Sequence, residues 1–87
     1  MHIELYKSDP KFIIDLLHRT HLMRIIPNLQ NATEHPECDE FVLCELDMDG
    51  VQELVGQLSF ETNHNSEKNV RERACDIADS IEVQIRA

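Results

Sequence analysis

The segment CELDMDG, residues 44–50, places three carboxylates on alternate positions before a glycine. This arrangement is typical of the first half of an EF-hand loop, in which oxygens at positions one, three and five bind calcium. If Gly50 takes the sixth position, the twelfth position falls on Gly56, where an EF-hand requires a glutamate. The residues before the segment also have strand character, whereas an EF-hand loop follows a helix. The spacing therefore argues against a calcium site.

Two structural explanations of the same segment remain open. Asp-Gly is a frequent turn dipeptide, so residues 47–50 can close a hairpin if residues 51–61 form a strand. Alternatively, Asp49 is the N-cap of a helix and Gln52 is its partner in a capping box. The apolar residues after Gly50 are spaced i, i+3, i+4 and i+7, which favours the helix.

A second set of chemically capable residues is Asp15, His18 and His21, spaced i, i+3 and i+6. These side chains suggest a metal-binding protein or a small hydrolase as an alternative function. Zinc requires three or four well-placed ligands, however, and the HExxH pattern is absent. Nucleophile and nucleotide motifs such as GxSxG and GxGxxG are also absent, and the chain has only two glycines. The sequence therefore favours a non-enzymatic role without a cofactor.

The charge distribution is the strongest functional clue. The chain of 87 residues has a formal net charge of −9, and residues 25–67 contain ten carboxylates but no Lys or Arg. Such a region repels nucleic-acid phosphates and attracts basic protein surfaces. The predicted partner-binding residues are eight of these carboxylates: Glu34, Glu37, Asp39, Glu40, Glu45, Asp47, Asp49 and Glu53.

The elements that must position these residues follow from hydrophobic periodicity. Alternation predicts a strand at about 2–6, and a compact run of strand-forming residues that is apolar on both faces predicts a second strand at about 40–46, covered on both sides. Helical spacing predicts helices at about 10–25, 50–61 and 67–85. The order βαβαα indicates an α+β protein in which a small two-stranded sheet is packed by three helices. A chain of this length is expected to form a single domain, residues 1–87. Strand direction stays open, because the connection between the strands permits either arrangement.

The predicted helix 10–25 has apolar residues on both sides. One broad apolar face is expected to pack against the core, whereas a second lies on the side that normally faces solvent. The second face predicts a homodimer contact made by Ile14, His18, His21, Leu22 and Ile25.

The first residues lack the basic and apolar regions of a secretory signal, and no apolar run is long enough to cross a membrane. The three irregularly spaced cysteines are typical of reduced thiols, so a cytoplasmic location without membrane attachment is predicted. The primary hypothesis is a small interaction or regulatory protein that binds a basic partner through residues 34–53. Besides the metal-binding or hydrolase alternative, a folded domain whose acidity has no binding role remains possible.

Overall fold

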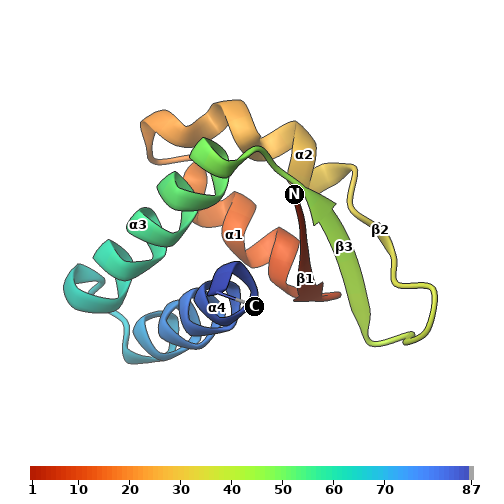
Figure 1. Ribbon diagram of the computed structural model, residues 1–87. Coiled ribbons are helices and arrows are strands. Elements are labelled where there is room, and N and C mark those ends of the chain that lie inside the picture. Colours follow the sequence, from red (N-terminus) through yellow and green to blue (C-terminus); the bar gives the residue numbers. More distant parts are fainter. Residues whose placement is uncertain (87) are drawn as a thin grey trace.

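The computed structural model describes residues 1–86 and shows an α+β fold, as the sequence predicts (Figure 1). The elements in chain order are β1 (His2–Tyr6), α1 (Asp9–Leu17), the 3-10 helix η1 (His21–Ile25), α2 (Ile26–Gln30), β2 (Thr33–Glu34), β3 (Phe41–Glu45), α3 (Met48–His64) and α4 (Lys68–Arg86). The two predicted strands correspond to β1 and β3. The helix α2 and the short strand β2 lie between the predicted helix 10–25 and the predicted strand 40–46, where the sequence predicts no helix or strand.

The three strands form one antiparallel sheet in the order β1-β3-β2, which settles the direction that the sequence left open. Ile3 pairs with Cys44 and Leu5 with Val42, so these side chains share one face of the sheet. That inner face packs on the helices: β1 contacts α1 and α4, and β3 contacts α2. Ile3, Leu5 and Cys44 are almost completely buried there.

The predicted continuous helix 10–25 is wrong, because the chain breaks after Leu17. Thr20 has extended backbone angles, and its hydroxyl accepts a hydrogen bond from the Leu22 amide at 3.1 Å. The same hydroxyl donates to the Leu17 carbonyl at 3.0 Å, so one side chain joins both sides of the break. A Ser or Thr that bonds locally to the backbone in this way competes with helix continuation.

Pro27, which follows the end of the predicted helix 10–25, lies in the first turn of α2. Proline is well suited to that position, because the first helical N–H groups have no acceptor within the helix. The short helix α2 places Leu29 in the core and carries the chain back to the sheet edge at β2.

The N-cap of α3 is Asp47, not Asp49 as the capping-box prediction proposed. The Asp47 side chain accepts a hydrogen bond from the Gly50 amide at 2.6 Å, and Asp49 lies in the first turn of the helix. The helix continues through residues 51–61, so the hairpin alternative is also wrong. The segment that resembles half a calcium loop is a strand end followed by a helix cap.

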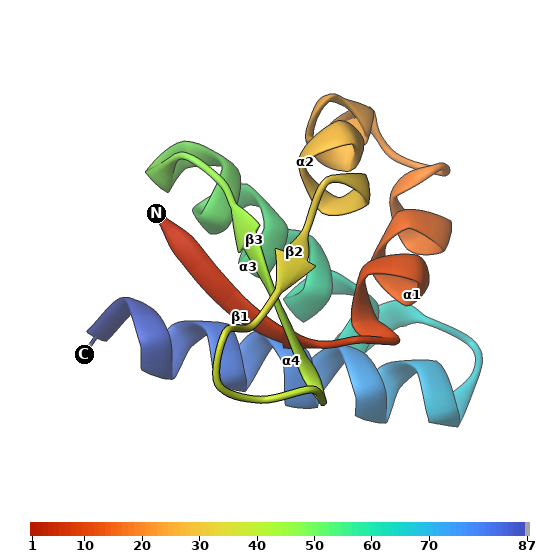
Figure 2. The ribbon, with the colours of Figure 1, turned by 90° about the vertical axis from the view of Figure 1, so that its right-hand side faces the viewer.

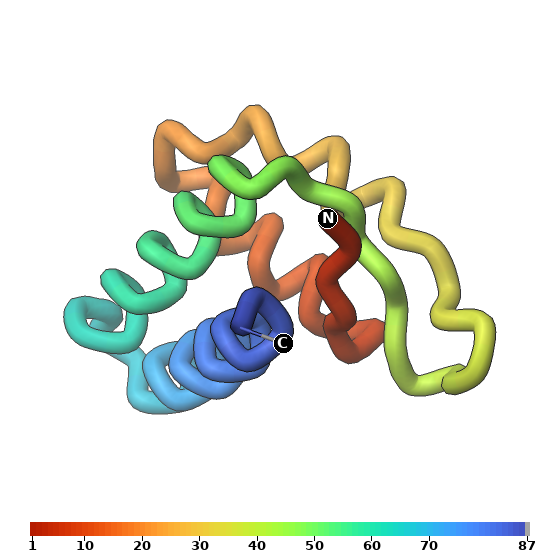
Figure 3. The backbone as a smooth tube through the Cα atoms, in the orientation of Figure 1, coloured from red at the N-terminus to blue at the C-terminus, as the bar shows by residue number. Residues whose placement is uncertain are grey.

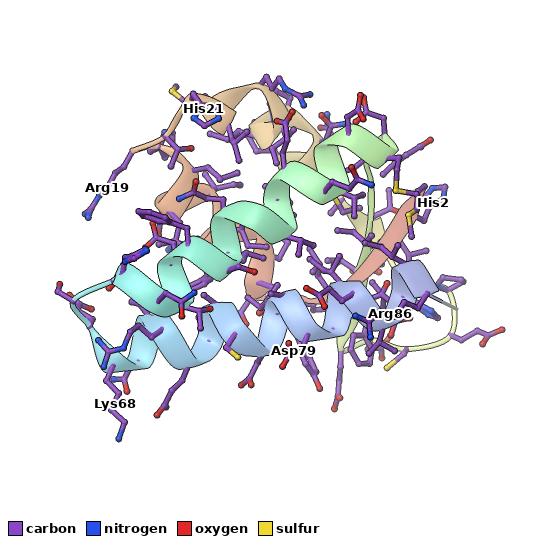
Figure 4. The ribbon with its side chains drawn as sticks, turned by 60° about the vertical axis from the view of Figure 1, so that its left-hand side comes forward. His2, Arg19, His21, Lys68, Asp79 and Arg86 are labelled. Carbon is purple, nitrogen blue, oxygen red and sulfur yellow. The ribbon has the colours of Figure 1, made fainter. Side chains whose placement is uncertain are left out.

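The helices α3 and α4 extend beyond the predicted ranges 50–61 and 67–85 and pack closely on each other. Figure 4 shows that they diverge from the turn that connects them, with other core elements behind the angle between them. Their buried positions recur at helical spacing: Val51, Leu54 and Leu58 from α3, and Ala74, Ile77, Ala78 and Ile81 from α4.

The outer edge of β1 is closed by side chains instead of another strand. The side-chain amide of Gln84 accepts from the Glu4 N–H at 2.6 Å and donates to the Glu4 carbonyl at 3.0 Å. The Asp9 carboxylate accepts from the Tyr6 N–H at 3.1 Å. Because these groups occupy the hydrogen-bonding positions that a further strand would need, strand addition at this edge is disfavoured.

Alanine substitution is expected to have different effects at the two glycines of α3. A Cβ at Gly56 meets no heavy atom within 4 Å, so Gly56→Ala should stabilise the protein by about 1 kcal/mol through helix propensity. A Cβ at Gly50 would lie 2.9 Å from the Asp47 carboxylate that caps the helix. We expect Gly50→Ala to give no such gain, because disturbing the cap costs about 1 kcal/mol and offsets the improvement in helix propensity. Urea denaturation of both variants measures the two changes, and equal effects would contradict the assignment.

Candidate functional site

One face of the sheet is not covered by a helix of the described chain. Figure 2 shows the strands in front of the helices, with α3 behind them. The side chains on this open face follow from the strand register and from alternation along each strand. They are His2, Glu4 and Tyr6 from β1, Phe41, Leu43 and Glu45 from β3, and Thr33 and His35 at β2 and just after it.

The sequence predicts that β3 is covered on both faces, and the structure corrects this. Phe41 and Leu43 are only half-buried, and Tyr6 is 56% exposed. The rings of Tyr6 and Phe41 stack with their centroids 4.7 Å apart. The open face therefore has an aromatic and aliphatic centre that water still reaches.

Two cross-strand polar pairs flank that apolar centre. The Glu4 carboxylate lies 3.2 Å from His35 Nε2, and the Glu45 carboxylate lies 3.6 Å from His2 Nε2. An apolar centre with a polar rim is the usual arrangement of a protein-binding surface.

Four of the eight predicted partner-binding carboxylates lie at the end of the sheet where β3 begins. Glu34 ends β2, and Glu37, Asp39 and Glu40 lie in the loop that leads to β3. All four are exposed, and within residues 1–86 none has a cation at ion-pair distance. We call these four residues the loop carboxylates.

The other four carboxylates lie where β3 ends and α3 begins, and three of them have partners within the chain. Glu45 lies beside His2, Asp47 caps α3, and Glu53 forms an ion pair with Arg24 at 2.8 Å. Asp49 is exposed in the first turn of α3, where a negative charge suits the helix dipole.

Most members of the two groups are separated by the length of β3, because Glu37, Asp39 and Glu40 precede the strand and Asp47, Asp49 and Glu53 follow it. Five residues of strand span about 16 Å, which is about twice the distance over which physiological salt screens exposed charges. Figure 3 shows the loop before β3 extending away from the helices, at the opposite end of the strand from the start of α3. Residues 34–53 therefore form two local acidic groups.

The residues of the predicted dimer contact occupy different environments. Leu22 and Ile25 are each 2% exposed and belong to the core, so the chain itself covers this part of the predicted contact face. Ile14 is partly buried against the same core, whereas His18 and His21 are exposed. A dimer contact through the exposed residues stays a prediction.

The residues of the metal or hydrolase alternative are all exposed. Asp15 lies on α1, which ends at Leu17, so His18 and His21 belong to the following turn and to η1. Figure 4 shows His21 on the opposite side of the molecule from His2. Within residues 1–86, no three His, Cys, Asp or Glu side chains are placed to hold a metal ion together.

The sequence did not predict a cleft of about 320 Å³ that adjoins the open face. Its walls are the ends of β1 and β3, the start of α1 and one side of α4. The lining residues are Glu4, Leu5, Tyr6, Ser8, Asp9, Phe41, Arg73, Asp76, Ile77 and Ser80. Alternation along β1 indicates that Tyr6 is exposed. No local sequence pattern predicts that α4 packs beside the end of the sheet.

The lining of this cleft includes an ion pair between α1 and α4. Asp9 is the one charged residue in the described chain that is buried, and its Oδ1 accepts from Arg73 Nη2 at 3.2 Å. Arg73 also donates to Ser8 Oγ at 2.9 Å, and its guanidinium lies over the Phe12 ring at 4.5 Å. Arg73 therefore links the helices that border the cleft.

Comparison of the chain with protein-family models, with curated proteins and with solved structures finds no match. Among residues 1–86, no helix combines the length and apolar character that crossing a membrane requires.

Proposed function

We propose that this protein is a small interaction protein that binds a basic partner protein through the open face of its sheet and the adjacent loop carboxylates. The observation that carries the proposal is the stack of the exposed Tyr6 on the half-buried Phe41, beside four carboxylates without counter-ions in the described chain. The carboxylates near α3 have a secondary role, because most of them are already engaged within the chain.

The chemistry of this surface favours a protein partner. Aromatic residues supply much of the binding energy at protein interfaces, and complementary charge raises the association rate. A nucleic acid would bring its phosphates against the loop carboxylates and be repelled. The exposed positions of Asp15, His18 and His21 give no comparable support to a metal-binding or hydrolytic function.

The first test neutralises the loop carboxylates together, as Glu34→Gln, Glu37→Gln, Asp39→Asn and Glu40→Gln. A matched control neutralises four carboxylates at and along α4, as Glu67→Gln, Glu72→Gln, Asp79→Asn and Glu82→Gln. Both variants have the same net charge, so a difference between them reports the location of the charge. Partners captured from a lysate of the source cells are identified by mass spectrometry, and each is then purified for kinetic measurement.

We expect a basic partner whose association rate falls about tenfold with the loop variant and much less with the control. The wild-type association rate should also fall steeply with added salt, because exposed charges are screened. Equal effects of the two variants would contradict the proposal. So would capture that persists unchanged in about 0.5 M salt, where screening is nearly complete.

A further inference from the structure

The cleft beside the open face carries the next inference, which concerns the kind of group that it binds. Its volume of about 320 Å³ is at the lower end of the range for ligand pockets, which suits a single long side chain. It adjoins the open face, because Phe41 and Tyr6 belong both to its wall and to that face. A partner bound to that face can therefore insert a side chain into the cleft.

The charges of the cleft favour a cation. Its lining contains three carboxylates, those of Glu4, Asp9 and Asp76, and one guanidinium, that of Arg73. Arg73 and Asp9 neutralise each other through their ion pair, and the second Asp9 oxygen accepts the Tyr6 N–H. An anionic ligand would compete with Asp9 for Arg73 and would also face the other two carboxylates.

Two carboxylates remain to bind the cation. Asp76 is exposed and forms no ion pair within residues 1–86. Glu4 lies beside His35, and it stays available to a stronger cation because a histidine is charged only when it is protonated, whereas arginine and lysine carry a permanent charge. The strand β1 supplies Glu4 and the helix α4 supplies Asp76, so the two carboxylates reach the cleft from different elements.

The aromatic wall favours a long basic side chain over a small inorganic cation. Tyr6 and Phe41 present an apolar surface on which the methylene groups of arginine or lysine can lie. A guanidinium or ammonium group near the exposed Tyr6 ring also gains a cation–π interaction. A cation–π contact of this kind is already present within the protein, where the Arg73 guanidinium lies over the Phe12 ring.

We propose that the cleft between the end of the sheet and α4 binds an arginine or lysine side chain of the basic partner. The carboxylates of Asp76 and Glu4 bind its charged head, and the Tyr6–Phe41 stack supports its stem. This inference rests on the proposed function and makes the cleft the anchor point of the same interface. A long basic side chain in a confined pocket is typical of the few residues that supply most of the energy at an interface.

The test uses a small probe, so it does not depend on finding the partner. ¹⁵N-labelled protein is titrated with N-acetyl-arginine methylamide and, as a neutral isostere, with N-acetyl-citrulline methylamide, while amide chemical shifts are recorded. We expect saturable shifts at Glu4, Tyr6, Asp76 and Ser80 with the arginine probe, and no saturable shifts with the citrulline probe.

Two aspartates of α4 provide a matched pair of variants. Asp76 lines the cleft, whereas Asp79 lies near α3 and accepts a hydrogen bond from the Cys75 thiol. Asp76→Asn should weaken binding of the arginine probe by about fivefold to tenfold, as expected for loss of a charge-assisted hydrogen bond. Asp79→Asn should change it less than about twofold, because its charge is exposed and screened.

Equal weakening by both variants, or saturable binding of the citrulline probe in the cleft, would overturn the proposal. Cleft shifts with inorganic phosphate would overturn it as well, because Arg73 would then be the ligand-binding group. The outcome is separable from the test of the loop carboxylates. If the loop variant loses the partner but the arginine probe misses the cleft, the inference fails and the proposed function stands. If the arginine probe binds in the cleft but the loop variant and the control affect partner binding equally, the cleft site stands and the proposed function fails.

Discussion

Replacing Leu22 with alanine is expected to lower the free energy of unfolding by about 3 kcal/mol, which corresponds to a fall in Tm of roughly 15 °C for a domain of this size. The reason is that Leu22 is 2% exposed and belongs to the core of its own chain. Truncation there removes buried methyl groups and leaves a cavity that the surrounding residues fill only in part. The loss should be independent of protein concentration.

The neighbouring residue provides the control. Met23 is 52% exposed, so Met23→Ala should change the unfolding free energy by less than about 0.5 kcal/mol. Urea denaturation at two protein concentrations, together with sedimentation of the wild type and both variants, checks these expectations. A small loss of stability with Leu22→Ala, accompanied by dissociation of a dimer, would place Leu22 at a subunit contact instead.

The second large effect concerns Cys44, whose thiol is buried in β3 and donates to the Asn28 carbonyl at 3.4 Å. Burial raises the pKa of Cys44 from 9.0 to about 11. Above pH 9 the unfolded chain loses this proton, whereas the folded protein keeps it up to about pH 11. As pH rises through this window, loss of the thiol proton stabilises the unfolded chain, whereas the folded protein keeps its proton. The free energy of unfolding therefore falls with rising pH.

The expected loss between pH 9 and pH 11 is about 2 kcal/mol, and below pH 9 the thiol has no such effect. Urea denaturation across this range should therefore show a flatter pH dependence for Cys44→Val than for the wild type. The difference between the two proteins isolates Cys44, because the other groups that ionise here are common to both. One of these is Cys75, whose pKa is raised chiefly by the Asp79 carboxylate. If the unfolding free energies of the wild type and Cys44→Val changed with pH in parallel, the raised pKa of Cys44 would be contradicted.

Thiol labelling gives an independent check on Cys44. At pH 8 the folded protein should leave Cys44 unmodified by iodoacetamide, because the thiol is buried and protonated. The same reagent should modify it fully in denaturing urea. Rapid modification of Cys44 in the folded protein would show that β3 opens locally.

Much of the secondary structure could be predicted from the sequence because its signals are local. The alternation of His2–Tyr6 and the helical spacing of residues 67–85 each depend on side chains within one element. The break after Leu17 could not be predicted in this way. It depends on a single hydroxyl that bonds to both sides of the turn, and apolar periodicity carries no information about it.

The candidate site shows the same division. The loop carboxylates were predicted because charge can be counted along the chain. Their separation from Asp47 and Glu53 was not predicted, because it depends on β3 extending between the two groups. The cleft was missed altogether, since Glu4 and Asp76 line the same cleft only because α4 packs against β1.

By itself the sequence determined the α+β class, the approximate position of both long strands and the acidic character of residues 25–67. These properties follow from composition and from periodicity within single elements. The tertiary structure decided that Leu22 and Ile25 lie inside the chain, that one face of the sheet stays open, and that an aromatic wall meets two carboxylates beside it. Those outcomes depend on which elements pack together, and packing is determined by contacts between residues that are distant in the sequence.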